Sequence, residues 1–339
     1  MTATQQPIAV LGAGSWGTAL ALVLARNGHS VRLWGHVPSH MESLARGREN
    51  RRYLPGVRFP DTLEPTADLR QASDGVRDIL IAVPSLAFRD ILQQLQPRLP
   101  SDARIIWATK GLDADSGGLL HEVVAENAPG HPMAVLSGPS FAAEVAARKP
   151  TAVTIASTDQ GFAEDMVERF YSEDFRPYSS SDVIGVELGG AVKNVLAIAT
   201  GIADGMELGA NTRAGLITRG LAELARLGDS LNADPMTFMG LSGMGDLILT
   251  CTDNQSRNRR LGLALGRGQS LERAVAEIGQ TVEGMYTARE VRKLAQRHDV
   301  EMPICDQVYR IMAQGLPPSD AVRALMQRAP RGESPLTDG

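Results

Sequence analysis

Short β-branched apolar runs alternate with helix-period segments over about the first 180 residues, and this alternation stops near Ser181. The strand-like runs are Ile8–Leu11, Ser30–Trp34, Asp78–Val83, Ala103–Ala108, Met133–Leu136, Thr151–Ala156 and Phe175–Tyr178. Between them lie segments with helical spacing of apolar residues, such as Thr18–Asn27, Ser85–Gln94 and Phe162–Phe170. Strands that alternate with helices predict a parallel sheet with helices on both faces.

The remainder of the chain carries no further strand signal. The helices expected there are Val183–Glu207, Ala214–Leu227, Ser256–Gly266, Ser270–Ile278, Gly284–His298 and Ala321–Gln327. A length of 339 residues suits two domains of roughly 150 residues each. We therefore predict an α/β fold, with a doubly wound parallel sheet in domain 1–181 and an all-helical domain at 182–339. No solvated linker separates them, so a cleft between the domains is the expected binding site. The polar tail Arg331–Gly339 is expected to fray.

The charge and cysteine content exclude several classes of protein. The chain has 34 Lys plus Arg and 39 Asp plus Glu, a formal net charge of −5, whereas binders of nucleic acid or anionic membranes need a basic surface. Cys251 and Cys305 are too few for a disulfide framework or a zinc cluster, and no metal is expected. The uncharged stretch 8–25 is interrupted by glycines and has no basic segment before it, so we expect no membrane insertion and a cytoplasmic protein.

A glycine motif, Gly12-Ala13-Gly14-Ser15-Trp16-Gly17, follows the first predicted strand and opens the first predicted helix. In such a motif Gly12 permits a tight turn, Gly14 lets a pyrophosphate approach the backbone, and Gly17 allows close helix–strand packing. The phosphate then lies on the helix N-terminus. Because the strand, the spacing and the helix C-cap at Asn27-Gly28 all agree, the motif predicts a Rossmann-type dinucleotide site rather than an ordinary tight turn.

The second predicted strand ends in Leu33-Trp34-Gly35-His36, without an acidic residue. An NAD-specific site usually has Asp or Glu there, about 20 residues after the glycine motif, to bind the ribose 2′-hydroxyl. Its absence removes repulsion against a 2′-phosphate, and His36 can donate to that group. We therefore expect NADPH to be favoured, or at least accepted beside NADH. The alternative for His36 is an ordinary exposed loop histidine.

Two further predicted strands end in polar residues at the sheet edge where ligands of open α/β sheets bind. Ala108-Thr109-Lys110-Gly111 ends the fourth strand, and Lys110 can hold an anion or a hydroxyl group. Ser137-Gly138-Pro139-Ser140-Phe141-Ala142 ends the fifth and supplies hydroxyls and backbone N–H groups. A solvated lysine and a non-functional Gly-Pro turn are the structural alternatives.

In the first helix of the second domain, Gly185, Gly189 and Lys193 share one stripe. Glycine costs a helix about 1 kcal/mol relative to alanine, so this face needs close approach by packed backbone or by a ligand. A lysine desolvated there has a lowered pKa and can exchange a proton near neutrality, the alternative being a structural, ion-paired lysine.

Asp246 ends Gly243-Met244-Gly245-Asp246, a glycine-flanked acid between predicted helices, where the carboxylate can accept a hydrogen bond from a hydroxyl or orient Lys193. Gln255-Ser256-Arg257-Asn258-Arg259-Arg260 follows, with three positive charges. Ser256 is a good N-cap, so its neighbours crowd a helix N-terminus, which favours anions. An arginine fork there matches a phosphate group, although a charge run is also typical of a solvated helix face.

These segments together resemble, over nearly the whole chain, the bacterial NAD(P)-dependent glycerol-3-phosphate dehydrogenase family. The most specific match is Gly190-Ala191-Val192-Lys193-Asn194 with the glycines, aspartate and asparagine that follow it up to Asn211. The glycine motif, Ala-Thr-Lys-Gly, Ser-Gly-Pro-Ser-Phe-Ala, Gly-Met-Gly-Asp and Gln-Ser-Arg-Asn-Arg-Arg occur in the family's order.

The resemblance implies roles for individual residues. It implies NADPH contacts at Ser15, Trp16, His36, Lys110, Ala142, Arg257, Val282 and Glu283. It implies substrate contacts at Lys110, Gly138, Ser140, Lys193, Asp246, Ser256, Arg257 and Asn258. Trp16 departs mildly from the family's frequent Tyr, and His36 stands where some members carry Arg, which makes the NADP preference less certain.

The reaction implied is reversible reduction of dihydroxyacetone phosphate to sn-glycerol 3-phosphate, which supplies the backbone of glycerophospholipids. Hydride comes from C4 of the nicotinamide, and Lys193 exchanges the proton while Lys110 and Asp246 orient the oxygen. The partners expected are these small molecules. A homodimer through the helical domain is compatible with the resemblance, although nothing in the sequence pattern requires it.

Two kinds of protein are alternatives to this family: a different dehydrogenase built on a similar plan, and a non-catalytic protein that binds NADPH. A β-hydroxyacid or 6-phosphogluconate dehydrogenase pairs the helix lysine with an Asn four residues later, where this chain has Ala197 and places Asn194 next to the lysine. A sugar-nucleotide dehydrogenase needs a reactive cysteine, whereas Cys251 lies in an apolar run. A non-catalytic NADPH sensor would keep the glycine motif but has no reason to combine Lys193 and Asp246 with a phosphate site.

Overall fold

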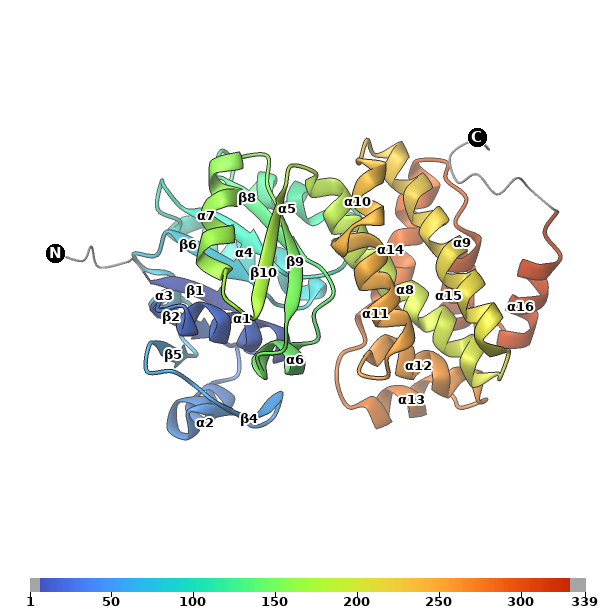
Figure 1. The fold of residues 1–339 in the computed structure, drawn as a ribbon, viewed down its shortest axis with the longest axis horizontal. Helices are drawn as coiled ribbons and strands as arrows, with labels where there is room; N and C mark the ends of the chain where they lie inside the picture. Colours follow the sequence, from blue (N-terminus) through green and yellow to red (C-terminus); the bar gives the residue numbers. More distant parts are fainter. Residues whose placement is uncertain (1–6, 330–339) are drawn as a thin grey trace. The chain divides into compact units, whose positions relative to one another are not determined.

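The computed structural model describes residues 7–329, which form two compact units (Figure 1). Unit 1 contains the residues up to Thr109 together with Leu120–Val183, and unit 2 contains Lys110–Leu119 together with the residues from Ile184 onward. The predicted single boundary between residues 181 and 182 does not account for the segment Lys110–Leu119, which belongs to unit 2. The predicted division of labour between the two parts stays a prediction, and the tail Arg331–Gly339 lies outside the described residues.

Unit 1 is built on an eight-stranded sheet with strand order β10-β9-β8-β7-β6-β1-β2-β5. The strands are β1 (Ile8–Leu11), β2 (Val31–Trp34), β5 (Leu63–Thr66), β6 (Asp78–Ile81), β7 (Arg104–Trp107), β8 (Met133–Ser137), β9 (Thr151–Ala156) and β10 (Phe175–Ser180). All neighbours pair in parallel except β8 and β9, which are antiparallel. The strand order reverses between β1 and β6, and this is the switch point of a doubly wound sheet.

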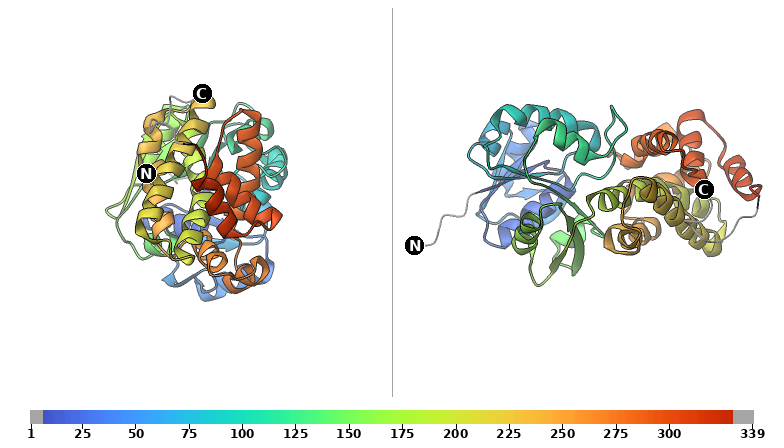
Figure 2. Two further views of the ribbon diagram at one scale, coloured as in Figure 1. Left: turned by 90° about the vertical axis from the view of Figure 1, so that its right-hand side faces the viewer. Right: turned by 90° about the horizontal axis from the view of Figure 1, so that it is seen from above.

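Helices cover both faces of this sheet, so the predicted Rossmann-type fold is confirmed. The helices are α1 (Ser15–Arg26), α2 (Pro38–Gly47), α3 (Leu69–Ser73), α4 (Phe88–Leu95), α5 (Leu120–Asn127), α6 (Ala142–Ala146) and α7 (Gln160–Phe170), with short 3₁₀ turns at Ser85–Ala87 and Gln96–Arg98. Figure 2 shows α4 and α5 on one face and α1 and α7 on the other. The central strands β1, β6 and β7 are buried along their whole length, because both faces are covered.

The sequence pattern does not predict three short strands of unit 1 or the direction of a fourth. The edge strand β5 contains Pro65 and only one fully buried residue, and edge strands tolerate proline that a central strand would not. A two-stranded hairpin, β3 (Glu49–Asn50) and β4 (Leu54–Arg58), is too short and polar to give a strand signal. The antiparallel direction of β9 is also not predicted, because a β-branched run carries no information about strand direction.

Unit 2 is helical among its described residues, as predicted. Its helices are α8 (Val183–Gly205), α9 (Gly209–Ser230), α10 (Pro235–Met239), α11 (Asp246–Thr252), α12 (Arg257–Gly266), α13 (Leu271–Ile278), α14 (Glu283–Arg297), α15 (Pro303–Gln314) and α16 (Pro318–Met326). A π-helical turn, Leu241–Gly245, runs directly into α11. The sequence pattern missed α10, α11 and α15, which are short or begin at a proline.

Helix α8 forms the core of unit 2. It is the one helix among residues 7–329 long and apolar enough to cross a membrane, but 94% of its most apolar window is buried inside the protein, as in the core helix of a soluble protein. Glycines bring α12 into backbone contact with it. A Cβ on Gly201 would overlap the Arg259 carbonyl, and one on Gly262 would overlap the Ile198 carbonyl. This crossing places the N-terminus of α12 beside the middle of α8.

Candidate active site

The glycine motif in unit 1 forms the turn that the sequence predicts. Gly12 has φ +125°, and a Cβ there would lie 2.5 Å from the carbonyl oxygen of Ala82, directly after β6. A Cβ on Gly17 would overlap the Gly12 carbonyl. Both glycines are therefore required by the fold, and they hold the loop at the switch point between β1 and β6.

Gly14 differs from these two glycines, because a Cβ there would meet no protein atom within 4 Å. It is the N-cap of α1 and provides no side-chain cap, so the first N–H groups of α1 keep their capacity for an outside acceptor. The open backbone at a helix N-terminus fits a pyrophosphate group. Ser15 and Trp16 begin α1, and the indole Nε1 of Trp16 is buried without a hydrogen-bond partner.

Two histidines that follow β2 lie near an arginine of the β3–β4 turn. His36 is exposed, directly after Gly35. Burial lowers the pKa of His40, and the nearby charges of Arg52 and His36 lower it further, while a hydrogen bond to the Ala13 backbone opposes them. The Arg52 guanidinium lies 5.0 Å from the centre of the Tyr53 ring. Two exposed groups that can carry positive charge, His36 and Arg52, therefore lie near the glycine motif.

Polar groups follow β7 and β8, as predicted. Thr109 ends β7 and donates from Oγ1 to the Val83 carbonyl at 2.7 Å. After β8, Gly138 has φ +145°, and Ser140 Oγ donates to the Gly138 carbonyl at 2.9 Å. Ala142 is the first residue of α6. The Ser137 hydroxyl, in the last residue of β8, is buried without a hydrogen-bond partner among the described residues.

A buried group of charges lies in unit 2, where Lys110, Lys193, Asp246 and the hydroxyl of Thr250 form what we call the lysine–aspartate cluster. Lys193 Nζ donates to Asp246 Oδ1 at 2.5 Å and to Thr250 Oγ1 at 3.1 Å, while Lys110 Nζ donates to Asp246 Oδ2 at 2.6 Å. The side chains are buried, with 1% of Asp246, 9% of Lys193 and 13% of Lys110 exposed. One carboxylate is therefore shared by two ammonium groups.

Burial decides the protonation of this cluster. It lowers the pKa of Lys193 to about 8, because the Lys110 charge adds to desolvation and together they outweigh the attraction of Asp246. Burial raises the pKa of Asp246, but the two ammonium groups outweigh burial and hold this pKa below its usual value. Near neutrality the cluster thus contains an ionised carboxylate and a lysine that can give up a proton.

Local backbone packing explains how the cluster is held. A Cβ on Gly189 of α8 would overlap the Ser242 carbonyl, so the glycine stripe beside Lys193 receives backbone at that point rather than a ligand. The sequence places Asp246 between helices, whereas in the structure it is the first residue of α11. Gly243 lies within the π-helical turn. A Cβ on it would overlap the Phe238 backbone, so the glycine is needed for packing. π-helical turns such as this one are frequent at functional sites.

The residues at the N-terminus of α12 that the sequence suggests for phosphate binding fall into two groups. Ser256 caps the helix, its Oγ accepting from the Arg259 N–H at 3.2 Å. Arg259 is buried and holds Asp204 at 2.6 Å and the Cys251 carbonyl at 2.9 Å, so it is structural. Arg257 reaches only Gln280, at 3.3 Å. The first-turn N–H groups of Arg257 and Asn258 have no acceptor within the helix.

Asn258 also ties three helices together. Its Nδ2 donates to Asn194 Oδ1 at 2.9 Å, and its Oδ1 accepts from the Gly284 N–H at 2.9 Å. Val282 caps α14 and Glu283 is its first residue. Burial raises the pKa of Glu283 against the opposing charges of Arg257, Lys110 and Lys193. The positions named from the resemblance in α12 and α14 thus lie within electrostatic reach of the cluster.

Sequence reasoning missed Thr250, whose signal is only its spacing of one helical turn after Asp246. It also did not anticipate that Lys110 belongs with unit 2. Cys251 is fully buried and desolvation raises its pKa to about 12, so the expectation of an inert small residue is confirmed. No group of His, Cys, Asp and Glu side chains in residues 7–329 is arranged to hold a metal ion.

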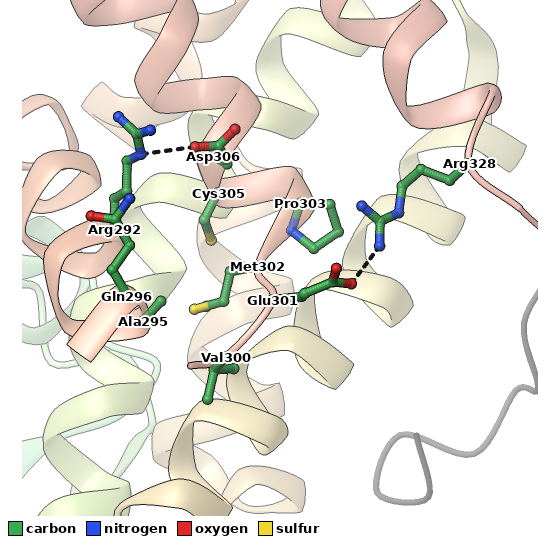
Figure 3. Close-up of a pocket in the computed structure, with 10 residues that line it drawn as sticks. All are labelled: Arg292, Ala295, Gln296, Val300, Glu301, Met302, Pro303, Cys305, Asp306 and Arg328. Atoms are coloured by element: carbon green, nitrogen blue, oxygen red, sulfur yellow. Dashed lines mark hydrogen bonds and ion pairs between the residues drawn. The ribbon is translucent and has the colours of Figure 1, made fainter. Parts of the chain in front are cut away.

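A cavity of about 230 Å³ lies elsewhere in unit 2, between the end of α14 and the start of α15 (Figure 3). Its walls carry the ion pairs Arg292–Asp306 at 2.9 Å and Arg328–Glu301 at 2.7 Å. Its charges are paired with one another, and it contains none of the predicted site residues. It therefore does not compete with the lysine–aspartate cluster as the reaction site.

Comparison with known proteins identifies the family of the chain. The family model for the NAD-dependent glycerol-3-phosphate dehydrogenase N-terminus matches residues 7–163, and that for its C-terminus matches residues 182–323. Curated relatives named glycerol-3-phosphate dehydrogenase [NAD(P)+] include one from Halorhodospira halophila, 57% identical over 96% of this chain and 98% of the relative. Another, from Edwardsiella ictaluri, is 53% identical over 98% of this chain and 99% of the relative.

Solved structures give the same result. The crystal structure of glycerol-3-phosphate dehydrogenase from Coxiella burnetii is 52% identical, with a TM-score of 0.94 over 96% of this chain and all of that one. The enzyme from Saccharomyces cerevisiae is 27% identical, with a TM-score of 0.81 over 95% of this chain and 99% of that one. The chain belongs to the NAD-dependent glycerol-3-phosphate dehydrogenase family.

Proposed function

We propose that this chain reduces dihydroxyacetone phosphate to sn-glycerol 3-phosphate with NADPH or NADH, reversibly, through the lysine–aspartate cluster. The observation that carries the proposal is the buried Asp246 carboxylate, which is shared by the ammonium groups of Lys110 and Lys193. An ionised triad of this kind is expensive to bury and is expected where chemistry needs it. We place the reaction in the cytoplasm, where it supplies glycerophospholipid backbones, and expect the enzyme to be a homodimer.

Unit 1 is suited to hold the dinucleotide. The open backbone at Gly14 and the uncapped N-terminus of α1 accept a pyrophosphate, while Gly12 and Gly17 fix the loop. Ser15 and Trp16 begin the same helix, and we assign Ala142, Val282 and Glu283 to the cofactor from the family resemblance. When bound, the dinucleotide supplies a hydride.

The α12 N-terminus in unit 2 is suited to the substrate phosphate. The Ser256 hydroxyl and the first N–H groups of the helix present donors, and the Arg257 guanidinium adds a charged fork. Asn258 has its side-chain amide committed to Asn194 and Gly284, so we assign its phosphate contact to the backbone N–H. Gly138 and Ser140 are assigned to the substrate from the family resemblance.

The proton comes from Lys193. As the carbonyl carbon accepts the hydride, its π bond breaks and the oxygen, which keeps the electron pair, takes a proton from Lys193 Nζ. With both lysines protonated the cluster carries two positive charges and one negative, and the excess positive charge stabilises the developing alkoxide. After transfer, Lys110 and Asp246 remain as a neutral pair. Thr250, which accepts from Lys193 at 3.1 Å, keeps the amine oriented.

We further propose that His36 and Arg52 favour NADPH over NADH by facing the 2′-phosphate. Both are exposed near His40, the strand end Leu33-Trp34-Gly35-His36 carries no acidic residue, and stacking on Tyr53 keeps Arg52 in place. The double variant His36→Ala, Arg52→Ala should weaken NADPH binding about tenfold or more, the amount expected for losing charged hydrogen bonds, and leave NADH binding unchanged. An equal loss for both cofactors would contradict this assignment.

The proposed reaction is tested by following NADPH and NADH oxidation with dihydroxyacetone phosphate and, as a matched substrate without phosphate, dihydroxyacetone. We expect turnover of the phosphorylated substrate and little of the other. Cofactor binding without oxidation would contradict the proposal and favour a non-catalytic NADPH sensor.

A further inference from the structure

The segment Lys110–Leu119, which we call the strap, leaves unit 1 at Thr109 and belongs to unit 2. Leu112 and Leu119 are buried in the hydrophobic core of unit 2, together with residues of α8 and α14. Lys110, the first residue of the strap, donates a hydrogen bond to the Asp246 carboxylate. The geometry of the lysine–aspartate cluster therefore depends on how firmly the strap is held.

The strap is closed by its own hydrogen bonds. The Asp113 N–H donates to the Gly118 carbonyl at 2.9 Å, and the Gly117 N–H donates to the Asp113 carbonyl at 2.8 Å. The buried Asp113 carboxylate accepts from Ser116 N–H at 3.0 Å and from Ser116 Oγ at 2.7 Å. These bonds close the turn 113–118, so a shift at its tip is passed to Asp113, three residues from Lys110.

The tip of the strap is seated on α14 through Gly117. Arg297 Nη2 donates to the Gly117 carbonyl at 2.5 Å. Gly117 has φ +64°, and a Cβ there would lie 3.0 Å from Glu290 Oε2 and 3.4 Å from Lys293 Cδ. Glu290 is itself buried and fixed by Lys293 at 3.0 Å. We call this contact of Gly117 with Glu290, Lys293 and Arg297 of α14 the seat, and it favours glycine at position 117.

We propose that Arg297 is a positioning residue for the reaction: by seating the strap on α14 it holds the Lys110 ammonium on Asp246. The inference rests on the proposed function of the cluster. Arg297 touches no cluster residue, and its side chain is largely exposed, so its contribution acts through the Gly117 carbonyl.

Loss of the seat has a consequence that a purely structural role lacks. If Lys110 leaves Asp246, the charge that helps to lower the pKa of Lys193 is withdrawn, and that pKa rises. The other groups in electrostatic contact with Lys193 are Asp246, Glu283 and Cys251, and the substitution alters none of them. The pH at which reduction declines should therefore move upward when the strap is released.

The test compares Arg297→Ala, Arg297→Lys and Gly117→Ala with matched controls. Arg292→Ala removes an ion pair from the same helix without touching the strap, and Gly130→Ala places alanine at φ +78° with no atom within 4 Å. We expect Arg297→Ala and Gly117→Ala to lower kcat about fivefold, within the range for coupled residues, with Arg297→Lys partly restored and both controls near wild type.

A double-mutant cycle identifies the path of the effect. In a Lys110→Ala background, Arg297→Ala should lower kcat less than twofold, because the group it positions is already gone. Equal losses in both backgrounds, or an unshifted pH profile for Arg297→Ala, would overturn the proposal. Hydrogen exchange at Asp113, Gly117 and Gly118 gives an activity-independent readout, and it should quicken in Arg297→Ala but not in Arg292→Ala. Wild-type protein that fails to turn over dihydroxyacetone phosphate would refute the proposed function, while the exchange result still judges the seat.

Discussion

The glycine motif of unit 1 and the lysine–aspartate cluster of unit 2 are built in different ways. The motif uses backbone from six consecutive residues and one neighbouring strand end, with Gly12 and Gly17 fixed by contact and Gly14 left open. The cluster uses side chains from positions 110, 193 and 246, which only the fold brings together. A binding loop of this kind is local in sequence, whereas a buried ionised triad requires the whole helical unit.

The largest effect should fall on the cluster. Lys193→Ala removes the proposed proton donor and should lower kcat by about 10²- to 10⁴-fold, the usual range for an acid–base group, with little change in cofactor affinity. Steady-state kinetics and cofactor titration measure the two quantities. Lys149→Ala, which removes an exposed lysine of unit 1, is the control. Near-normal turnover in Lys193→Ala would remove the cluster from the mechanism.

Two glycines of the motif should respond differently to the same substitution. Gly12→Ala forces a strained φ and a contact 2.5 Å from the Ala82 carbonyl, so it should destabilise the fold by about 1–3 kcal/mol or more. Gly14→Ala meets no protein atom and should leave stability unchanged while weakening cofactor binding. Thermal unfolding and cofactor titration separate the two. Equal destabilisation by both would contradict the distinction between a structural and a binding glycine.

Substrate binding should depend on the α12 N-terminus. Arg257→Ala should raise KM for dihydroxyacetone phosphate about tenfold or more, as expected for losing a hydrogen bond to a charged group, and change kcat much less. Arg260→Ala, an exposed arginine one turn further along α12, is the matched control. If the two variants have the same KM as wild type, the phosphate does not lie at this helix end.

A smaller effect is expected at Thr250. Thr250→Val removes the hydroxyl that accepts from Lys193 at 3.1 Å while keeping the shape of the side chain. We expect kcat to fall several-fold, in line with the roughly 1 kcal/mol of an ordinary hydrogen bond, and KM to stay unchanged. Thr250→Ser should restore most of the loss. A rise in KM without a change in kcat would instead place Thr250 in substrate binding.

The same contrast explains what the sequence predicts and what it does not. The ends of β1 and β9 match the predicted strands, and Ser256 is the helix cap that its residue type indicates. By contrast, the sequence does not reveal that Arg259 is spent on Asp204 while Arg257 is left at the helix surface. Two neighbouring arginines look alike in a charge run, and only packing against Asp204 and the Cys251 carbonyl separates them.

The glycine stripe beside Lys193 is ambiguous in the sequence for the same reason. Gly189 indicates a close approach to that helix face, but the sequence leaves open whether a ligand or backbone makes it. In the structure the packed backbone of Ser242 occupies the place of the missing side chain. Lys110 follows β7 at the position that the sequence predicts, yet its membership of unit 2 depends on the burial of Leu112 and Leu119 in the core of that unit.

The pH dependence of kcat in both directions tests the central claim most directly. Lys193 must be protonated to reduce dihydroxyacetone phosphate, so reduction should be full below its pKa of about 8 and decline as the pH rises through that value. Oxidation of sn-glycerol 3-phosphate needs the neutral amine and should rise through the same pH. The residual activity of Lys193→Ala should lack this inflection. Profiles that are flat between pH 6 and 10, or an inflection that persists in Lys193→Ala, would contradict the assignment of the proton transfer to the lysine–aspartate cluster.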